Sequence, residues 1–157
     1  MRQILWQREV RADCWRYPGE AGDGPLVQTL SELLADANRP PGAGTGVWLG
    51  PIDEVALLVP QLPQLALIVV NFEASGDGRG YSQGQLLRQR LGYQRELRAA
   101  GAIRRDHLFL LARCGFDAFD FAPGEDPRAA LAGLDSYSVG YQPASGTLVQ
   151  PRMRTPG

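Results

Sequence analysis

The sequence feature that most constrains the fold is the apolar run Leu65–Phe72. It is apolar at almost every position and β-branched at its centre, which is typical of a strand buried on both faces. Strands of this kind belong to parallel sheets, whose connections carry helices that cover the sheet. We therefore expect an α/β fold with a parallel sheet that includes this run.

Two further strands are expected at Arg95–Ala99 and Asp117–Phe121. The segments before them, Ser82–Leu91 and Ala102–Cys114, carry apolar residues at helical spacing, and each is followed by a glycine that can end a helix. Strands and helices thus alternate. We expect consecutive βα units whose strands are parallel neighbours in sequence order.

A weak internal repeat supports this interpretation. Arg90–Tyr93 aligns with Arg113–Phe116, and Ala99–Gly101 aligns with Ala122–Gly124. One period is about the length of a short helix plus a short strand, and consecutive units of that kind imply right-handed crossovers. An open sheet and a partial βα barrel both satisfy the pattern.

The N-terminal part predicts smaller elements. Aromatic and aliphatic residues at short spacing in Ile4–Arg8 and Asp13–Tyr17 predict a small hairpin. Leucines at helical spacing predict a helix over Leu26–Ala37. We also expect a short strand at Val47–Leu49 and a helical turn at Asp53–Leu58, which the following prolines end.

Length and hydropathy bound the organisation of the chain. Its 157 residues suit one domain with a proper core, which we expect to span residues 1–142. The polar, proline-containing residues 143–157 are expected to form a disordered C-terminal tail. Acidic residues, prolines and glutamines interrupt the longest apolar stretch, so no membrane span is expected. The first residues lack the apolar core of a signal peptide, which makes the cytoplasm the expected location.

The composition excludes several classes of function. The net charge of −1 gives no basic field, so nucleic acid is not an expected partner. All sixteen basic residues are arginine, which excludes a Schiff-base lysine and a P-loop lysine. One histidine and two distant cysteines, Cys14 and Cys114, do not suit an iron–sulfur cluster or structural zinc. We expect no metal, haem or flavin cofactor, and an unbridged pair of cysteines.

The candidate functional site is the glycine-rich turn that follows the apolar run. Its glycines let the backbone take positive φ and pass close to another group. In α/β proteins ligands gather where strands end and helices begin, and a helix N-terminus offers N–H groups to an anion. Ser82 and Gln85 have the spacing of a capping box, so the helix is expected to begin at Ser82. The predicted anion-binding residues are Asp77, Gly78, Arg79, Gly80, Tyr81 and Ser82, joined by Arg98 from the next strand.

A structural role for the turn is the alternative. Asp77 and Arg79 could pair with each other or with backbone and so hold the turn in place. Elsewhere, Cys114 is expected to be a small buried hydrophobic residue, because a helix carbonyl end raises the pKa of a thiol. His107, on the apolar side of its helix, is expected to be a core or edge histidine. No Ser/His/Asp or Cys/His catalytic set can be identified.

Four motifs occur in order along the chain, in the segments Asp77–Ser82, Leu87–Tyr93, Glu96–Gly101 and Arg113–Phe119. Together they resemble domain-of-unknown-function family 934, over about half of the chain. Members of that family are bacterial, are usually encoded beside the sulfite reductase haemoprotein, and are often labelled as oxidoreductases of sulfite reduction. The chain departs from the family pattern at Gly84, where a bulkier helix former such as alanine is usual.

The resemblance implies an accessory protein of assimilatory sulfite reduction. Such a protein would dock on sulfite reductase, or handle sulfite or a related oxyanion at the glycine-rich turn. Two alternatives remain at this level. One is a small cofactor-independent enzyme on a partial barrel, with Asp77 or Asp117 as base, and the other is a purely structural subunit.

Overall fold

The computed structural model describes residues 2–35, 44–74 and 76–136. Within them, one sheet holds seven strands in the order β2-β1-β7-β6-β5-β4-β3. The strands are β1 Gln3–Trp6, β2 Glu9–Ala12, β3 Val27–Thr29, β4 Thr45–Leu49, β5 Leu65–Phe72, β6 Glu96–Gly101 and β7 Ala118–Asp120. The α-helices are α1 Leu30–Ala35, α2 Gly78–Gln85, α3 Leu108–Arg113 and α4 Pro127–Ser136; η1 Val55–Gln64 and η3 Arg105–His107 are 3₁₀ helices, and η2 Leu86–Arg90 is a π-helix.

The five strands β3 to β7 are parallel and lie side by side in sequence order. The predicted α/β fold of consecutive βα units is therefore confirmed, and β5, β6 and β7 are parallel neighbours as expected. Strands β2 and β3 form the two edges, so the sheet is open. The parallel part nevertheless has the strand order of a segment of a βα barrel.

The predicted N-terminal hairpin is formed by β1 and β2, which pair antiparallel. Gln7 and Arg8 connect them with φ of 46° and 70°, the backbone that a two-residue hairpin turn requires. This tight turn returns the chain at once, so the second strand is Glu9–Ala12 and the prediction of Asp13–Tyr17 is wrong. β1 also pairs antiparallel with β7, which joins the hairpin to the parallel strands.

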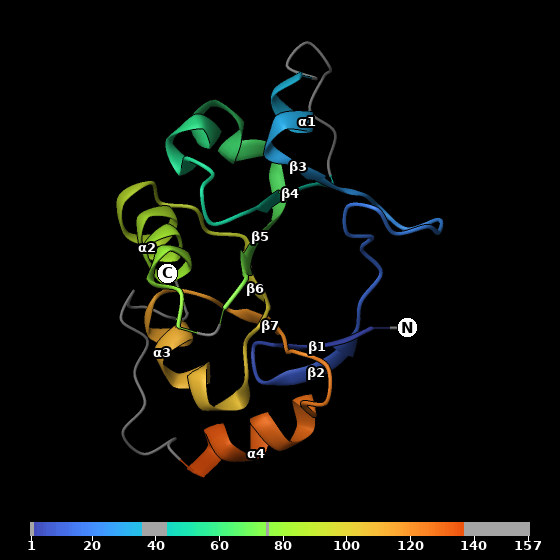
Figure 1. Ribbon diagram of the computed structural model, residues 1–157, viewed down its shortest axis with the longest axis vertical. Helices are drawn as coiled ribbons and strands as arrows, with labels where there is room; N and C mark the ends of the chain where they lie inside the picture. Colours follow the sequence, from blue (N-terminus) through green and yellow to red (C-terminus); the bar gives the residue numbers. More distant parts are fainter. Residues whose placement is uncertain (1, 36–43, 75, 137–157) are drawn as a thin grey trace.

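All helices that connect the parallel strands lie on one face of the sheet, which we call the helix face. Right-handed crossovers between strands that never reverse their order must all fall on the same side, and Figure 1 shows α2 and α3 together on one side of the strands. Along β5, Ile68, Val70 and Phe72 point to this face and belong to a large apolar core. Leu67 and Val69 alternate with them and point the other way.

The opposite face is covered by the segment 13–24, which follows β2, and we call it the loop face (Figure 1). Its smaller apolar cluster contains Tyr17 from this segment and Leu67 and Val69 from β5. The Tyr17 ring packs against Trp48 of β4 with ring centroids 4.8 Å apart. The loop face therefore has a core of its own, which one irregular segment closes.

Two sequence predictions are corrected here. The predicted helix Leu26–Ala37 begins with strand β3, and α1 starts only at Leu30. Thr29 and Glu32 form a capping box, in which the Glu32 N–H donates to Thr29 Oγ1 and the Thr29 N–H donates to Glu32 Oε1. The 3₁₀ helix η1 spans Val55–Gln64 and contains both prolines, so the prediction that they end the helical turn at Leu58 is wrong. Each missing proline N–H removes one turn hydrogen bond without ending the helix.

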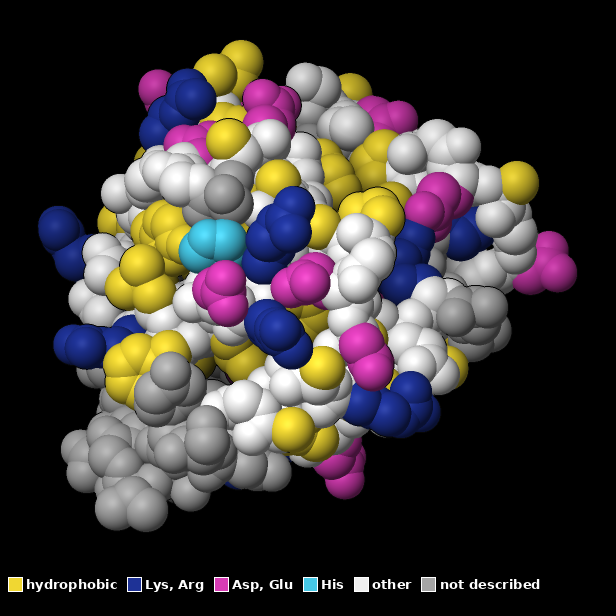
Figure 2. Space-filling view, turned by 60° about the horizontal axis from the view of Figure 1, so that its bottom comes forward, with side chains coloured by type: hydrophobic (Ala, Val, Ile, Leu, Met, Phe, Trp, Pro, Cys, Tyr) yellow, Lys and Arg dark blue, Asp and Glu magenta, His cyan; other side chains and the backbone are white. Residues whose placement is uncertain are grey.

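The predicted C-terminal tail, residues 143–157, lies outside the described residues. Across the ranges that are described, no helix combines the length and the apolar character needed to cross a membrane. The surface in Figure 2 carries acidic and basic side chains that are mixed with each other, without a large area of one sign.

Candidate functional site

The turn between β5 and α2 places Asp77 at the N-cap of the helix. Its backbone is extended, and its Oδ1 accepts a hydrogen bond of 3.0 Å from the Arg79 N–H. Helix α2 therefore begins at Gly78, and the predicted start at Ser82 is wrong. Aspartate caps a helix as well as serine does, and the earlier start adds a helical turn that packs on the sheet. Ser82 lies within the helix and is exposed.

Two glycines of α2 allow the helix to lie close to the apolar core. A Cβ atom on Gly80 would lie 2.4 Å from Phe72 Cε2, and a Cβ atom on Gly84 would lie 2.4 Å from Phe116 Cε2. Tyr81 also packs on Phe72, edge to face, with ring centroids 5.2 Å apart. The structure thus gives Gly80 and Tyr81 packing roles, and it explains why Gly84 can be no larger.

Arg79 is the exposed cation of the turn. Its side chain is 63% exposed, and its Nε lies 3.2 Å from Asp77 Oδ1. Asp77 and Arg79 therefore form the ion pair that the structural alternative for the turn had predicted. Within the described residues, Nη1 and Nη2 of Arg79 have no hydrogen-bond partner, so two nitrogens of the guanidinium remain available.

Arg98 does not join the turn. It lies on the loop face of β6, is fully buried, and uses all five of its N–H donors inside the fold. Nη1 and Nη2 donate to the two carboxylate oxygens of Asp13 at 2.8 and 3.1 Å. Nε and Nη2 donate to Glu96, and Nη1 also donates to the Tyr17 hydroxyl. The prediction that Arg98 binds the same anion as Arg79 is therefore corrected, because no donor remains for a ligand.

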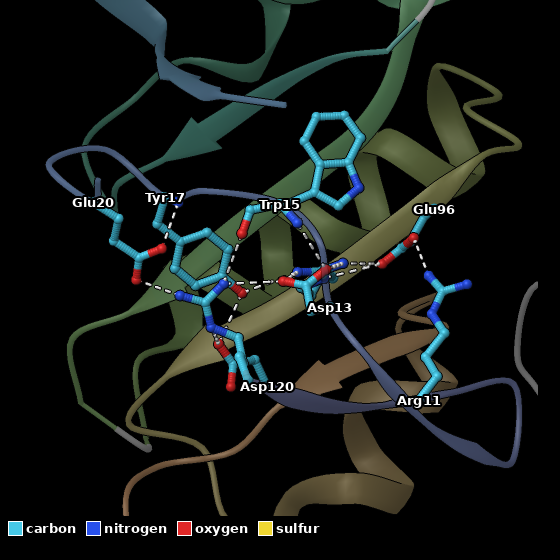
Figure 3. Close-up of polar contacts among 9 residues, drawn as sticks. Arg11, Asp13, Trp15, Tyr17, Glu20, Glu96 and Asp120 are labelled. Atoms are coloured by element: carbon cyan, nitrogen blue, oxygen red, sulfur yellow. Dashed lines mark hydrogen bonds and ion pairs between the residues drawn. The ribbon is translucent and has the colours of Figure 1, made fainter. Parts of the chain in front are cut away.

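A network of ion pairs surrounds Arg98, and Figure 3 shows how it spans the loop face. Arg2 pairs with Asp13 at 3.0 Å and with Asp120 at 3.4 Å, and it also pairs with Glu20. Its guanidinium lies over the Tyr17 ring, 3.7 Å from the centroid. The charged members are Arg2, Arg11, Asp13, Glu20, Glu96, Arg98 and Asp120. Three arginines thus face four carboxylates, and each carboxylate has a cationic partner.

Two carboxylates of this network, the buried Asp13 and the partly buried Asp120, have pKa values shifted in opposite directions. Burial opposes ionisation of Asp13, but the hydrogen bonds and charge of Arg98 outweigh it and lower the pKa of Asp13. Burial dominates at Asp120 and raises its pKa, although the Tyr17 hydroxyl donates to it at 2.8 Å and Arg2 is near. Burial also raises the pKa of Tyr17, so this phenol stays protonated.

A second arginine, Arg88, holds together the loops at the amino ends of β6 and β7. Nε donates to the Gly115 carbonyl at 2.7 Å, and Nη1 donates to the carbonyls of Tyr93 and Arg95 at 2.7 Å. Nη2 lies 3.2 Å from Asp117 Oδ1. Arg88 thus connects residues from both halves of the internal repeat.

The family model described as "Bacterial protein of unknown function (DUF934)" matches residues 46–151. This is more than half of the chain. The chain belongs to the DUF934 family. No curated protein and no solved structure matches the sequence.

The DUF934 match includes the β5–α2 turn, Arg88 and Arg98, but not the first 45 residues. Asp13 and Tyr17, two of the three partners of Arg98, therefore come from a part of the chain that the family model does not cover, whereas Glu96 lies inside it. The sequence did not point to these two residues as partners of Arg98, because 13–17 was expected to form a strand. Their signal was the alternation of Asp13, Trp15 and Tyr17, which suits a segment lying against a sheet as well as a strand.

The other candidate residues have structural surroundings. Cys114 is buried with 3% exposure, as expected for a small hydrophobic residue, and Cys14 is exposed; both thiols are free. His107 Nδ1 accepts a hydrogen bond from the Arg104 N–H, as expected of an edge histidine. Asp117 Oδ1 accepts from the Leu97 N–H. In the described ranges, no three histidine, cysteine or acidic residues gather as a metal site would require.

Proposed function

We propose that this DUF934 protein is a cytoplasmic accessory protein of assimilatory sulfite reduction. It binds sulfite or a related oxyanion at the β5–α2 turn and acts together with the sulfite reductase haemoprotein. The link to sulfite reduction rests on the resemblance of its four motifs to the family, because the family description itself gives no function. The binding element is Asp77–Ser82, now without Arg98.

The state of Arg79 is the observation that carries this proposal. The side chain stands in solvent at the start of α2, with Nη1 and Nη2 unpartnered within the described residues. A helix N-terminus attracts an anion, and a guanidinium can donate two parallel hydrogen bonds to an oxyanion. Because Asp77 already accepts the Arg79 N–H, the donors for an anion are the guanidinium and the Gly78 N–H.

The geometry favours a binding role over the cofactor-independent enzyme. The two candidate bases lie at opposite ends of the parallel strands, since Asp77 follows the carboxyl end of β5 and Asp117 precedes the amino end of β7. Each carboxylate also has a structural partner, Arg79 for Asp77 and Arg88 for Asp117. Either candidate base is thus already held in an ion pair, and this pairing is what favours a binding role.

Thermal melts with sulfite and with sulfate test the anion site. Ligand at a hundredfold excess over its dissociation constant adds about 2.7 kcal/mol to the stability of a protein that binds it. We expect this increase in the wild type and in Arg90→Ala, which removes an exposed arginine from the other end of the same helical segment. Arg79→Ala should show no such increase, and its melting temperature without anion should stay within a few degrees of the wild-type value. An increase in all three proteins, or in none, contradicts the proposed site.

A separate experiment tests the partner. The purified protein is mixed with purified sulfite reductase haemoprotein, and complex formation is followed by analytical ultracentrifugation. A defined complex that Arg79→Ala still forms would show that docking and anion binding are separate properties. If the two proteins sediment independently at micromolar concentrations, the proposed partnership is wrong, whatever the melts show.

A further inference from the structure

Strand β2 is an edge strand of the sheet and pairs on one side only, with β1. Each of its four residues is exposed or partly exposed, and none is buried. Helix α4 lies on the helix face of the hairpin (Figure 1), where Arg128 Nη1 donates to Gln3 Oε1 at 3.2 Å. Gln3 shares this face with Leu5, since side chains alternate along a strand. Within the described part of the chain, the outer side of β2 is therefore open.

The pairing with β1 determines which backbone groups of β2 point outward. The Asp13 N–H donates to the Arg2 carbonyl at 2.8 Å, and hydrogen-bonded pairs alternate with non-hydrogen-bonded pairs along an antiparallel ladder. Glu9 and Arg11 therefore direct their N–H and C=O groups to β1, whereas Val10 directs its own groups away from the sheet. Among the described residues, these two groups of Val10 have no hydrogen-bond partner. Such an edge is a template for pairing with another strand.

The side chains of β2 make this edge complementary to itself. Glu9 and Arg11 flank Val10 and both point to the loop face, where Arg11 Nη2 donates to Glu96 at 2.7 Å. That bond leaves Nε and Nη1 of Arg11 without a hydrogen-bond partner in the described residues. Glu9 is exposed and has no ion-pair partner among the same residues. In an antiparallel pair of β2 strands centred on Val10, each Glu9 lies directly opposite Arg11 of the other copy, whereas like charges would repel.

We propose that two copies of this chain associate through their β2 strands, which pair antiparallel about a two-fold axis at Val10. The Val10 N–H of each copy donates to the Val10 carbonyl of the other, and the two sheets join into one. The interface is isologous, so the contact between Glu9 and Arg11 forms twice. A strand of four residues buries little area, so the dimer is weak. The inference is independent of anion binding at the β5–α2 turn.

Charge reversal tests this interface by analytical ultracentrifugation of the full chain at low salt. In Glu9→Arg, arginines face arginines across the two-fold axis, and in Arg11→Glu, carboxylates face carboxylates. Each variant alone should dimerise about tenfold more weakly than the wild type. In a mixture of the two variants every opposing pair again has opposite charges, so a heterodimer should form about as tightly as the wild-type dimer. A wild type that stays monomeric at several hundred micromolar, or a mixture that associates no better than its components, overturns the proposal.

A backbone variant tests the hydrogen bonds at the two-fold axis. Val10→Pro removes the outward N–H, whereas the ladder to β1 uses the N–H groups of Glu9 and Arg11 and keeps its bonds. Val10→Pro should not dimerise, and the matched control Val10→Thr, which retains the N–H, should dimerise as the wild type does. Equal dimerisation of these two variants overturns the proposal. Circular dichroism checks that each variant is folded, and the proline and charge tests depend on different contacts, so either one decides the question if a variant of the other fails to fold.

Discussion

The two faces of the sheet are stabilised by different physical means. The helix face buries a continuous apolar core under regular helices, and contacts such as Gly84 on Phe116 depend on shape. The loop face is closed by an irregular segment and holds a fully buried arginine among carboxylates. Apolar packing tolerates many replacements of similar volume, whereas a buried charge depends on every one of its partners. The two faces should therefore respond differently to mutation, pH and salt.

The adjacent residues Leu97 and Arg98 give the largest test of this comparison, because they point to opposite faces of β6. Arg98→Met removes the buried cation that Asp13 and Glu96 share and leaves them only the partly exposed Arg2 and Arg11, so it should destabilise by about 3–5 kcal/mol in urea denaturation. Leu97→Ala should cost about 2–5 kcal/mol through loss of apolar contact. Combining Arg98→Met with Asp13→Leu and Glu96→Leu should recover most of the loss. If the triple variant is less stable than Arg98→Met alone, charge pairing does not explain the loop face.

The next largest loss of stability is expected on the helix face, where a larger residue at Gly84 would overpack α2 against Phe116. Gly84→Ala gains about 1 kcal/mol of helix propensity, but its Cβ meets Phe116, and overpacking costs about 1–3 kcal/mol. We expect net destabilisation, which the added change Phe116→Leu should relieve. Gly78→Ala, where a Cβ has open space, should be neutral or slightly stabilising. A Gly84→Ala variant more stable than wild type would contradict the close approach of α2.

The pH dependence of stability separates two carboxylates within the loop face. The folded-state pKa of Asp13 is lowered, so its contribution is present above its unfolded pKa of about 3.9 and is lost as pH falls through the lower folded value. The folded-state pKa of Asp120 is raised, so its contribution is present at low pH and is lost as pH rises through the folded value. The stability loss from Asp13→Asn should therefore shrink on acidification. On acidification, the stability of the wild type should increase relative to that of Asp120→Asn.

Chemical denaturation between pH 2.5 and 7 measures both profiles, with Leu97→Ala as a variant of the helix face whose loss should not depend on pH. If the stability differences between wild type and the two aspartate variants change in the same direction with pH, the pKa values of Asp13 and Asp120 are not shifted in opposite directions.

The smallest effect is expected at the rim of the network. Arg11 is 39% exposed and pairs with Glu96 at 2.7 Å. Such exposed pairs contribute about 0–1 kcal/mol and are screened by salt. Arg11→Gln should therefore lose less than 1 kcal/mol, and its difference from wild type should shrink in 1 M sodium chloride. A loss as large as that of Arg98→Met would mean that the network acts as one unit from rim to centre.

The sequence predicted the helix face well, because that face obeys periodic rules. The apolar run Leu65–Phe72 became β5 with the expected bounds, and the order of the strands followed from alternating βα units. The loop face follows no such rule. Arg98 looked like a ligand-binding residue because its partner Asp13 lies 85 positions away, and only the tertiary structure brings them together.

At the candidate site, too, some features could be predicted from the sequence and others depend on the tertiary structure. The position of the turn at the start of a helix was evident from its glycines, but the residue that caps the helix was not. Asp77 and Ser82 both suit an N-cap, and the choice between them depends on how α2 packs against Phe72.

The pairing of β1 with β7 affects the order in which the strands of the sheet can assemble during synthesis. Among the strands that the structure describes, the ribosome releases the two hairpin strands before the others, and β7, the neighbour of β1 in the sheet, emerges last. Strands β3 to β7 can join the sheet one after another through contacts between consecutive units. The hairpin cannot, and during synthesis it exposes a strand edge that is prone to pair wrongly. The hairpin can therefore take its place in the sheet only after β7 has left the ribosome.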